Sequence, residues 1–260
     1  MIRATHLTFR AAGRALVDNV SLTFDAGKLH LIIGVNGAGK STLLRLLARL
    51  LRPSEGSIEY SGNAISDWSE RDLALRRAVL SQSTELGFSM RVRELVMMGR
   101  YPHFRTHPGK ADELVCDEVL RFFDADDLAL RDYNTLSGGE KQRVQFARVL
   151  AQIWHPLPNS PRFLFLDEPL TFLDISHQLE FMTKLREFAH QPDVVAVSVL
   201  HDLNLAAQFA DRLVLLHHGR VKADGAPENV LTVEQLREAF GISPTLIPHP
   251  QSGRPYLLLE

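Results

Sequence analysis

The chain has 260 residues, of which 45% are hydrophobic and 23% charged, and its formal net charge is −2. These values are those of a globular protein, and they give no basis for bulk affinity to nucleic acid or to an anionic membrane. With one cysteine, Cys116, the chain forms no intrachain disulfide, and a reducing compartment suits it.

The predicted elements of the first 60 residues are strands around one helix. The N-terminal segment is rich in β-branched residues and carries an Ala-Gly turn signal at 26–27. The apolar run LHLIIG then predicts a buried strand over 29–34, followed by a glycine-rich loop and an amphipathic helix that begins at Lys40. The segment GSIEYSG, residues 56–62, predicts a short strand that ends in a turn.

Residues 87–160 differ in character, because they contain no strong strand pattern and read as a mostly helical insertion. Strands return over 162–168, 194–200 and 212–219, with helices between them. Fully apolar strands that alternate with helices are typical of an α/β fold with a parallel sheet covered on both faces. We expect one domain over 1–260, with the core and its β part over 1–86 and 161–260 and the helical part over 87–160.

A phosphate-binding loop is the first chemical motif. The segment GVNGAGKST fits G-x-x-x-x-G-K-[ST] and lies between a predicted strand and a predicted helix, as this loop requires. Backbone N–H groups and the helix N-terminus would bind phosphate, Lys40 would add charge at the β- and γ-phosphates, and Ser41 would bind Mg²⁺. Glycines 37 and 39 let the loop curl without Cβ clashes. The candidate ATP-binding residues are Gly34, Val35, Asn36, Gly37, Ala38, Gly39, Lys40, Ser41 and Thr42.

Two acids follow a buried strand in FLFLDEP, residues 163–169. Asp167 is placed to hold the Mg²⁺ shell through water, and Glu168 stands beside the metal, where a water can be polarised for attack on the γ-phosphate. Together with the phosphate loop, the pair predicts a site of nucleotide hydrolysis. These two motifs alone leave a kinase, a GTPase and a helicase open.

The stretch NTLSGGEKQRVQFARVL, residues 134–150, predicts an amphipathic helix that begins after Ser137. Ser137 and Glu140 have the spacing of a capping box. Two glycines stand between them in the first turn, where each costs about 1 kcal/mol relative to alanine. We therefore expect something to approach the backbone closely at Gly138 and Gly139.

The segment LSGGEKQR, residues 136–143, resembles the signature sequence of ABC-type ATPases, and further motifs follow in that family's order. Gln82 is similar to the Q-loop glutamine, which senses Mg²⁺ and the γ-phosphate and touches the membrane subunits. Leu173 and Asp174 resemble the D-loop, and His201 resembles the switch histidine that contacts the γ-phosphate.

The resemblance implies a P-loop NTPase core with a mostly parallel, RecA-like sheet, an antiparallel β subdomain and an α-helical signature subdomain. The implied cofactors are ATP and Mg²⁺, with the metal organised by Ser41, Gln82 and Asp167. Glu168, His201 and Gln82 are the implied catalytic residues.

The same resemblance implies that two chains face head to tail and bury two ATP molecules between them. One chain's signature then contacts the γ-phosphate held by the Lys40 loop of the other, as an anion at a helix N-terminus. This interpretation explains why two glycines stand at the start of the helix, where the γ-phosphate would approach the backbone. The signature residues are Leu136, Ser137, Gly138, Gly139 and Glu140.

A narrower resemblance lies in MRVRELVMMGRYPH, residues 90–103, which is similar to ATPases of importers for iron-siderophores, haem and vitamin B12. With GRALVDNVSL and the long WHPLPNSPR insertion, the chain is most similar to those of haemin importers. This implies a homodimer on two copies of an integral membrane permease, at the cytoplasmic face of the bacterial inner membrane, with a periplasmic binding protein delivering cargo.

Two alternatives to haemin import stay open at this point. In the first, the protein is still an importer ATPase, but its cargo is a siderophore or vitamin B12. In the second, it belongs to another class, the soluble ABC proteins that act on DNA or ribosomes. One cassette, a net charge of −2 and the lack of a heptad array disfavour this second alternative. We expect no nucleic-acid partner.

The chain departs from the family pattern at two places. The D-loop reads LTFLD, with Phe172 where the family has small residues. At the position of the family's adenine-stacking aromatic, an ungapped alignment places Ala11, and Phe9 reaches it only with a shift. A packing role in a strand is the commoner one for such a phenylalanine.

Overall fold

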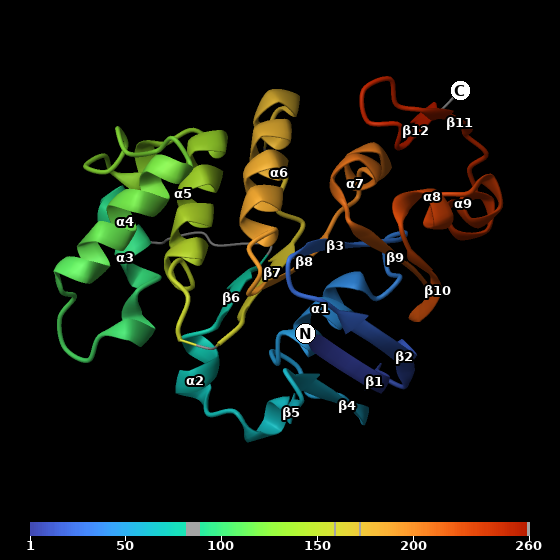
Figure 1. The fold of residues 1–260 in the computed structure, drawn as a ribbon, viewed down its shortest axis with the longest axis horizontal. Coiled ribbons are helices and arrows are strands. Elements are labelled where there is room, and N and C mark those ends of the chain that lie inside the picture. Colours follow the sequence, from blue (N-terminus) through green and yellow to red (C-terminus); the bar gives the residue numbers. More distant parts are fainter. Residues whose placement is uncertain (82–88, 159, 172, 259–260) are drawn as a thin grey trace.

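A six-stranded sheet runs through the centre of the computed structural model, in the order β10-β9-β3-β8-β7-β6 (Figure 1). The structure describes residues 1–81, 89–158, 160–171 and 173–258. The sheet's strands are β3 (Lys28–Ile33), β6 (Arg77–Leu80), β7 (Arg162–Asp167), β8 (Val194–Val199), β9 (Arg212–His217) and β10 (Arg220–Gly225). All neighbours pair in parallel except β10, which is antiparallel to β9 at the edge.

The apolar strands of this sheet are buried on both faces. Every residue of β7 and of β8 is buried, which explains why their sequences are continuous hydrophobic runs. Alternate residues serve different cores: Phe163 and Phe165 pack into one, whereas Leu164 packs into the other. The predicted α/β fold with a covered sheet is confirmed, and β10 adds an antiparallel edge with partly exposed residues.

A second, antiparallel sheet and α1 (Lys40–Leu47) cover one face of the central sheet. Its order is β2-β1-β4-β5, from β1 (Ile2–Ala11), β2 (Arg14–Phe24), β4 (Glu55–Tyr60) and β5 (Asn63–Ala64). The 3₁₀ helix η1 (Ile65–Asp67) and α2 (Glu70–Ala74) then lead to β6. This sheet is the antiparallel part that the family resemblance implies.

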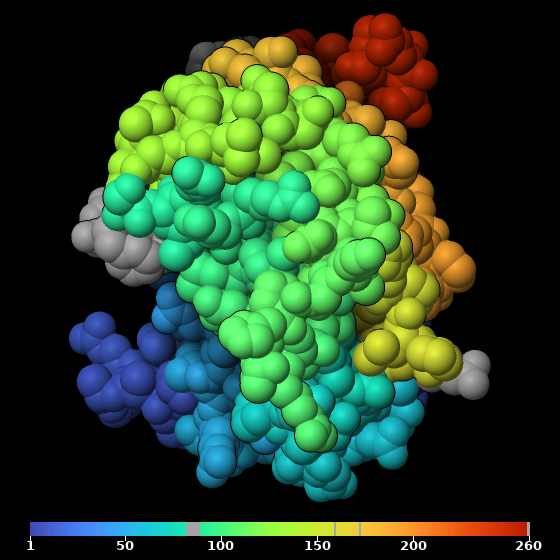
Figure 2. Space-filling model, turned by 90° about the vertical axis from the view of Figure 1, so that its left-hand side faces the viewer, coloured from blue at the N-terminus to red at the C-terminus, as the bar shows by residue number. Residues whose placement is uncertain are grey.

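The opposite face carries the helices of the larger core. The helical part consists of α3 (Val92–Met98), η2 (Tyr101–His103), α4 (Lys110–Phe122), η3 (Tyr133–Thr135) and α5 (Gly138–Ala151). It lies at one side of the molecule in Figure 1, and Figure 2 looks directly onto it as the green surface.

Further helices follow along the described part of the chain. They are α6 (Ile175–Ala189), α7 (Leu203–Phe209), α8 (Pro227–Val230) and α9 (Val233–Phe240). The chain then forms a hairpin of β11 (Thr245–Pro248) and β12 (Pro255–Leu258). No helix in the described ranges is long and apolar enough to cross a membrane.

The helix α5 begins as its sequence predicts. Ser137 Oγ accepts a hydrogen bond from Glu140 N at 3.3 Å, and Glu140 Oε2 accepts one from Ser137 N at 2.7 Å. Val144, Ala147 and Leu150 are buried as predicted, but Gln145, Phe146 and Val149 on other sides of the helix are buried too. The predicted capping box is therefore confirmed, whereas the single apolar face is not, because α5 is enclosed on most sides beyond its first two turns.

Candidate nucleotide site

The loop between β3 and α1 is shaped by glycines that neighbouring backbone requires. A Cβ atom on Gly39 would lie 2.2 Å from the carbonyl oxygen of Leu16, and one on Gly34 would lie 2.2 Å from that of Leu216. Both have positive φ angles, 98° at Gly39 and 150° at Gly34. Gly37, with φ of 79°, has open space around it and is favoured by its conformation alone. The loop is thus pressed against β2 and β9, which leaves its other side open.

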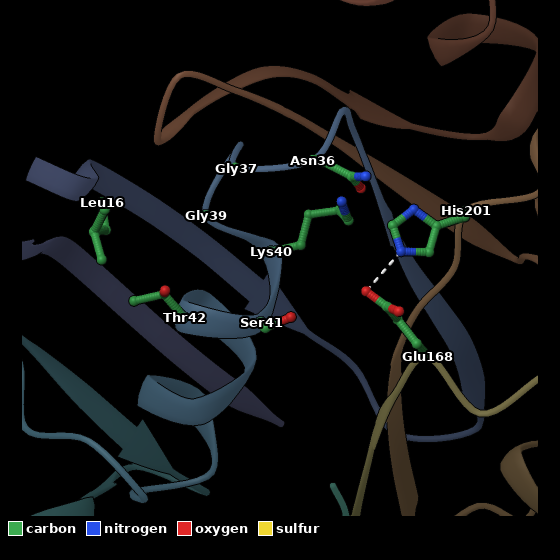
Figure 3. Close-up of a pocket in the computed structure, with 9 residues that line it drawn as sticks. All are labelled: Leu16, Asn36, Gly37, Gly39, Lys40, Ser41, Thr42, Glu168 and His201. Atoms are coloured by element: carbon green, nitrogen blue, oxygen red, sulfur yellow. Dashed lines mark ion pairs between the residues drawn. The ribbon is translucent and has the colours of Figure 1, made fainter. Parts of the chain in front are cut away.

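A cavity of about 550 Å³ opens above this loop (Figure 3). That volume lies within the range of small-molecule sites, roughly 300–1,000 Å³. Strand ends, the loop and the start of α1 all contribute to it. The lining residues are Leu16, Asn36, Gly37, Gly39, Lys40, Ser41, Thr42, Glu168 and His201.

Lys40 is buried at the base of the cavity. Its Nζ donates hydrogen bonds to the carbonyl oxygens of Gly34 at 2.9 Å and Val35 at 3.0 Å. Burial lowers the pKa of Lys40, and the carboxylates of Glu168 and Asp167 oppose that shift. The loop carbonyls therefore hold the ammonium group beside the glycine-rich loop, at the predicted phosphate-binding end of the site.

Ser41 and Asp167 meet although 126 positions separate them. Ser41 Oγ donates to Asp167 Oδ1 at 2.8 Å, joining the first turn of α1 to the carboxyl end of β7. Burial raises the pKa of Asp167, the hydrogen bond from Ser41 opposes that rise, and Glu168 adds to it. The arrangement follows from the parallel sheet, because β7 and β3 both end at the edge that carries the loop.

The donor set formed by Ser41 and Asp167 fits Mg²⁺. Both are hard oxygen ligands, and Mg²⁺ usually takes one or two carboxylates together with waters and substrate phosphates. Within the described ranges no group of three or more His, Cys, Asp or Glu side chains forms an all-protein metal cage. The two oxygens therefore suit a metal shared with a nucleotide.

Glu168 and His201 line the cavity and contact each other directly. Glu168 Oε1 lies 2.6 Å from His201 Nε2, the contact dashed in Figure 3. Glu168 has a positive φ of 53°, a conformation that non-glycine residues rarely adopt and that clusters at functional sites. The hydroxyl of Thr171 donates to its carbonyl oxygen at 3.0 Å and supports this turn. The turn aims the Glu168 carboxylate at the cavity.

The predicted signature residues lie apart from the cavity. Among the described residues that line it, none is Leu136, Ser137, Gly138, Gly139 or Glu140. A Cβ on Gly139 would meet the Leu173 side chain at 3.9 Å, an ordinary contact, so the described part of the chain does not itself require glycine there. The predicted close approach to the backbone at Gly138 and Gly139, by a group from outside this chain, stays a prediction.

The remaining predicted residues divide into described and undescribed ones. Leu173 is buried against the larger core, and Asp174 caps α6 by accepting a hydrogen bond from His177 N at 2.9 Å. Gln82 and Phe172 lie outside the described residues. Phe9 packs against the smaller core, which supports its packing role in β1.

Two contacts escaped the sequence analysis. Leu16 lines the cavity from β2, although its pattern is that of an ordinary strand residue. Gln142, in the second turn of α5, donates from Nε2 to the carbonyl oxygen of Pro169 at 2.6 Å. That bond joins the signature helix to the turn that carries Glu168. Only the spatial arrangement reveals either contact.

The glycine-rich loop, the buried lysine and the paired Ser41 and Asp167 are the features of a P-loop nucleotide-binding protein. The family model of the ABC transporter matches residues 17–171. The chain is 48% identical to the Hemin import ATP-binding protein HmuV of Gloeobacter violaceus, over 99% of this chain and 94% of that protein. It is 45% identical to the protein of the same name from Escherichia coli O157:H7, over 100% of both.

Solved structures agree with these sequence matches. An inward-facing conformation of a metal-chelate type ABC transporter matches all of this chain and 96% of that one, with a TM-score of 0.83 and 26% identity. A dimeric ABC transporter cassette matches 87% of this chain and 99% of that one, with a TM-score of 0.74 and 25% identity. The chain therefore belongs to the ABC transporter family and is an ABC-type ATPase, which confirms the predicted fold class and family.

Proposed function

We propose that this chain is the ATP-hydrolysing subunit of a bacterial haemin importer. The observation that carries the proposal is the full-length similarity, at 45% and 48% identity, to two proteins named for haemin import. The same similarity argues against a soluble ABC protein acting on DNA or ribosomes. Import of another metal chelate is the second candidate, favoured by the structural match to a metal-chelate type transporter.

In the proposed mechanism, the phosphate loop holds the nucleotide. Lys40 and the loop N–H groups bind the β- and γ-phosphates, at the positive end of α1. Leu16 contributes an apolar wall to the same cavity. Ser41 and Asp167, with Gln82, would hold Mg²⁺. When bound there, the metal neutralises charge that develops on the phosphates.

Glu168 polarises the attacking water. His201 orients Glu168 and stabilises the γ-phosphate. Support for these roles comes from their 2.6 Å contact at the mouth of the cavity. The buried Asp167 is held by Ser41, which leaves Glu168 as the carboxylate that faces the cavity. A general base in such a position typically contributes a factor of about 10²–10⁴ in rate.

We further propose that two copies of the chain pair head to tail. Ser137 and Gly139 of one copy then contact the γ-phosphate bound at Lys40 of the other. The open approach to Gly139 and the distance of the signature from the cavity both fit a site completed by a second chain. D-loop residues Leu173 and Asp174 would lie near the contact between the copies.

The pair would dock on two copies of an integral membrane permease at the cytoplasmic face of the inner membrane. A periplasmic binding protein would deliver cargo to the other side. The ATP-bound pair favours the closed arrangement and hydrolysis releases it, so that the cycle of the pair drives the permease.

The test is cargo-stimulated ATP hydrolysis by the complete complex. The chain is co-purified with its permease, reconstituted in vesicles and supplied with binding protein loaded with haemin, a ferric siderophore or vitamin B12. Haemin is expected to stimulate turnover and to accumulate inside the vesicles. Stimulation by one of the other cargoes alone would assign the complex to that cargo.

The variant Glu168→Gln serves as the control for hydrolysis in this assay. It is expected to bind ATP, to lose turnover by at least about 100-fold and to trap the paired form in Mg-ATP. Glu180→Gln removes a carboxylate from the exposed side of α6, where Glu180 pairs with Lys184, and should keep full turnover. Equal turnover in the Glu168 variant and the wild type would remove Glu168 from its proposed role.

A further inference from the structure

A carboxylate stands at the start of α5, where the proposed function brings a phosphate. The capping box fixes Glu140 there, because its Oε2 accepts a hydrogen bond from Ser137 N at 2.7 Å. Two such bonds with Ser137 hold the pKa of Glu140 below its usual range, so the group is charged at neutral pH. Negative charge at a helix N-terminus stabilises the free helix, but it repels a second anion that approaches the same place.

Arg131 provides the compensating charge. Its Nη1 lies 3.2 Å from Glu140 Oε1, on the carboxylate oxygen that the capping box does not use. Arg143 of α5 adds a smaller attraction to the Glu140 carboxylate, but the two nearest cations of α5 make their direct contacts with other groups. Lys141 Nζ lies over the Tyr133 ring, 5.8 Å from its centroid, and Arg143 Nη1 donates to backbone carbonyl oxygens at the end of α4.

The backbone at Arg131 is tied to the start of α3. Arg131 O accepts a hydrogen bond from Val92 N at 3.0 Å, and Tyr133 N donates to Met90 O at 2.9 Å. Asp132 pairs with Arg91 in an antiparallel bridge, and its side chain accepts a hydrogen bond from Ser89. These bonds fix the backbone from which the Arg131 side chain extends, next to the start of α3.

We propose that Arg131 is a positioning residue that neutralises Glu140, so that the start of α5 accepts the γ-phosphate of the nucleotide bound by a second copy of the chain. The inference rests on the proposed head-to-tail pair. A partly exposed ion pair of this kind adds little to folding stability. Its main effect is therefore on the electrostatic potential met by the incoming phosphate.

The experiment is a double-mutant cycle with Arg131→Gln and Glu140→Gln, in full-length chain that also carries Glu168→Gln. Glutamine at 140 keeps an acceptor for Ser137 N, so the cap is retained without its charge. Formation of the paired form is followed by sedimentation velocity while Mg-ATP is titrated. ATP binding to the unpaired chain is measured separately with a fluorescent ATP analogue at low protein concentration.

Arg131→Gln is expected to raise the half-saturating ATP concentration for pairing about tenfold, which lies within the range for partly buried charges at helix ends. In the double variant, the half-saturating ATP concentration should lie within about threefold of that of the Glu140→Gln single variant, because the charge that Arg131 neutralises is gone. Arg131→Lys, which keeps the charge, should lie between wild type and Arg131→Gln. ATP binding to the unpaired chain should not change, because the Lys40 loop is untouched.

Arg93→Gln is the matched control, because Arg93 forms a similarly exposed ion pair with Asp117 at 2.7 Å in the same helical part. It should leave pairing unchanged. Arg131→Gln without effect on pairing, or with an effect that Glu140→Gln does not reverse, would overturn the inference while Ser137→Arg still abolishes pairing. Normal pairing of Ser137→Arg would instead overturn the shared site, and the inference with it.

Discussion

The surroundings of Asp167 disfavour the charged form of its side chain. Its side chain is almost completely buried, and burial is the main cause of its raised pKa. Ser41 supplies one hydrogen bond, and the nearby Glu168 carboxylate adds repulsion. A carboxyl whose folded pKa exceeds its unfolded value of 3.8 lowers stability as pH rises from that value, and the loss is complete above the folded pKa. The proposed role of Asp167 in holding Mg²⁺ thus comes at the expense of stability.

Asp167→Asn is accordingly expected to raise the melting temperature at pH 7 by roughly 2–4 °C, the shift for about 1 kcal/mol in a chain of this size. The gain should shrink as pH falls through the raised pKa, because wild-type Asp167 then becomes neutral. Magnesium-dependent ATP hydrolysis should be lost. Scanning calorimetry from pH 7 towards pH 4 checks the first two outcomes. A gain that is equal at all pH values would show that desolvation of the charge is not its cause.

Residues whose role is local to a motif could be predicted from the sequence. Lys40 and Ser41 follow a glycine pattern with one structural meaning, and Asp167 ends an apolar run. Leu16 and Arg131 could not be predicted, because the cavity that Leu16 lines and the ion pair that Arg131 forms with Glu140 exist only in the folded chain. The backbone of Arg131 is held by strand-like hydrogen bonds between residues 131–133 and the start of α3, and no residue pattern encodes that pairing.

At the scale of elements, α5 is anchored at both ends. Its first turn is capped by Ser137 and Glu140. At its other end, cationic and imidazole groups satisfy the last carbonyls, as the negative end of a helix dipole favours. Arg100 donates to Ala151 O and His103 contacts Gln152 O, both at 2.7 Å, and Arg162 donates to the carbonyl oxygens of Ile153 and Trp154.

These anchors join different parts of the fold. Arg100 belongs to the segment between α3 and η2, whereas Arg162 begins β7, which ends at Asp167. In the proposed pair, α5 contacts the nucleotide bound by the partner copy, whereas β7 carries Asp167 of the chain's own nucleotide site. The bonds from Arg162 therefore fix α5 to the strand of the other site. Sequence periodicity predicted the helix and its cap but not these anchors, since buried arginines far apart in the chain give no local signal.

Arg100→Ala is expected to destabilise the chain by about 3–5 kcal/mol, because it leaves the buried carboxylate of Asp112 without its cation. Arg100 Nε lies 3.0 Å from Asp112 Oδ1, and both side chains are about nine-tenths buried. The double variant Arg100→Met with Asp112→Asn should lose much less, since it removes both charges. Urea unfolding followed by circular dichroism measures the difference. Equal losses in the two variants would mean that carbonyl capping dominates over the ion pair.

At the scale of the molecule, the two halves of the proposed active site lie on different parts of one chain. The cavity is formed at the carboxyl edge of the central sheet, while the signature begins a helix of the green part in Figures 1 and 2. The phosphate loop and the signature are each recognisable in sequence. That they do not meet within one chain is a property of the fold, and it makes a second copy necessary for the proposed mechanism.

A heterodimer tests this directly. One copy carries Lys40→Ala and the other Ser137→Arg, each with a different affinity tag for purification of the mixed pair. If sites are shared, both defects fall in one site, and the other site keeps an intact loop and an intact signature. The mixed pair should then retain one ATP after rapid gel filtration when both copies also carry Glu168→Gln.

Each variant homodimer has a defect in both sites and should retain almost no ATP, because Lys40→Ala weakens phosphate binding and Ser137→Arg blocks the contact at α5. Without Glu168→Gln, the mixed pair should hydrolyse ATP faster than either homodimer. If every site lay within one chain, each copy of the mixed pair would contain one defect in its own site. The Lys40→Ala copy would have a defective loop, and the Ser137→Arg copy would have a defective signature. The mixed pair would then be no better than the average of the two homodimers, which is the outcome that excludes shared sites.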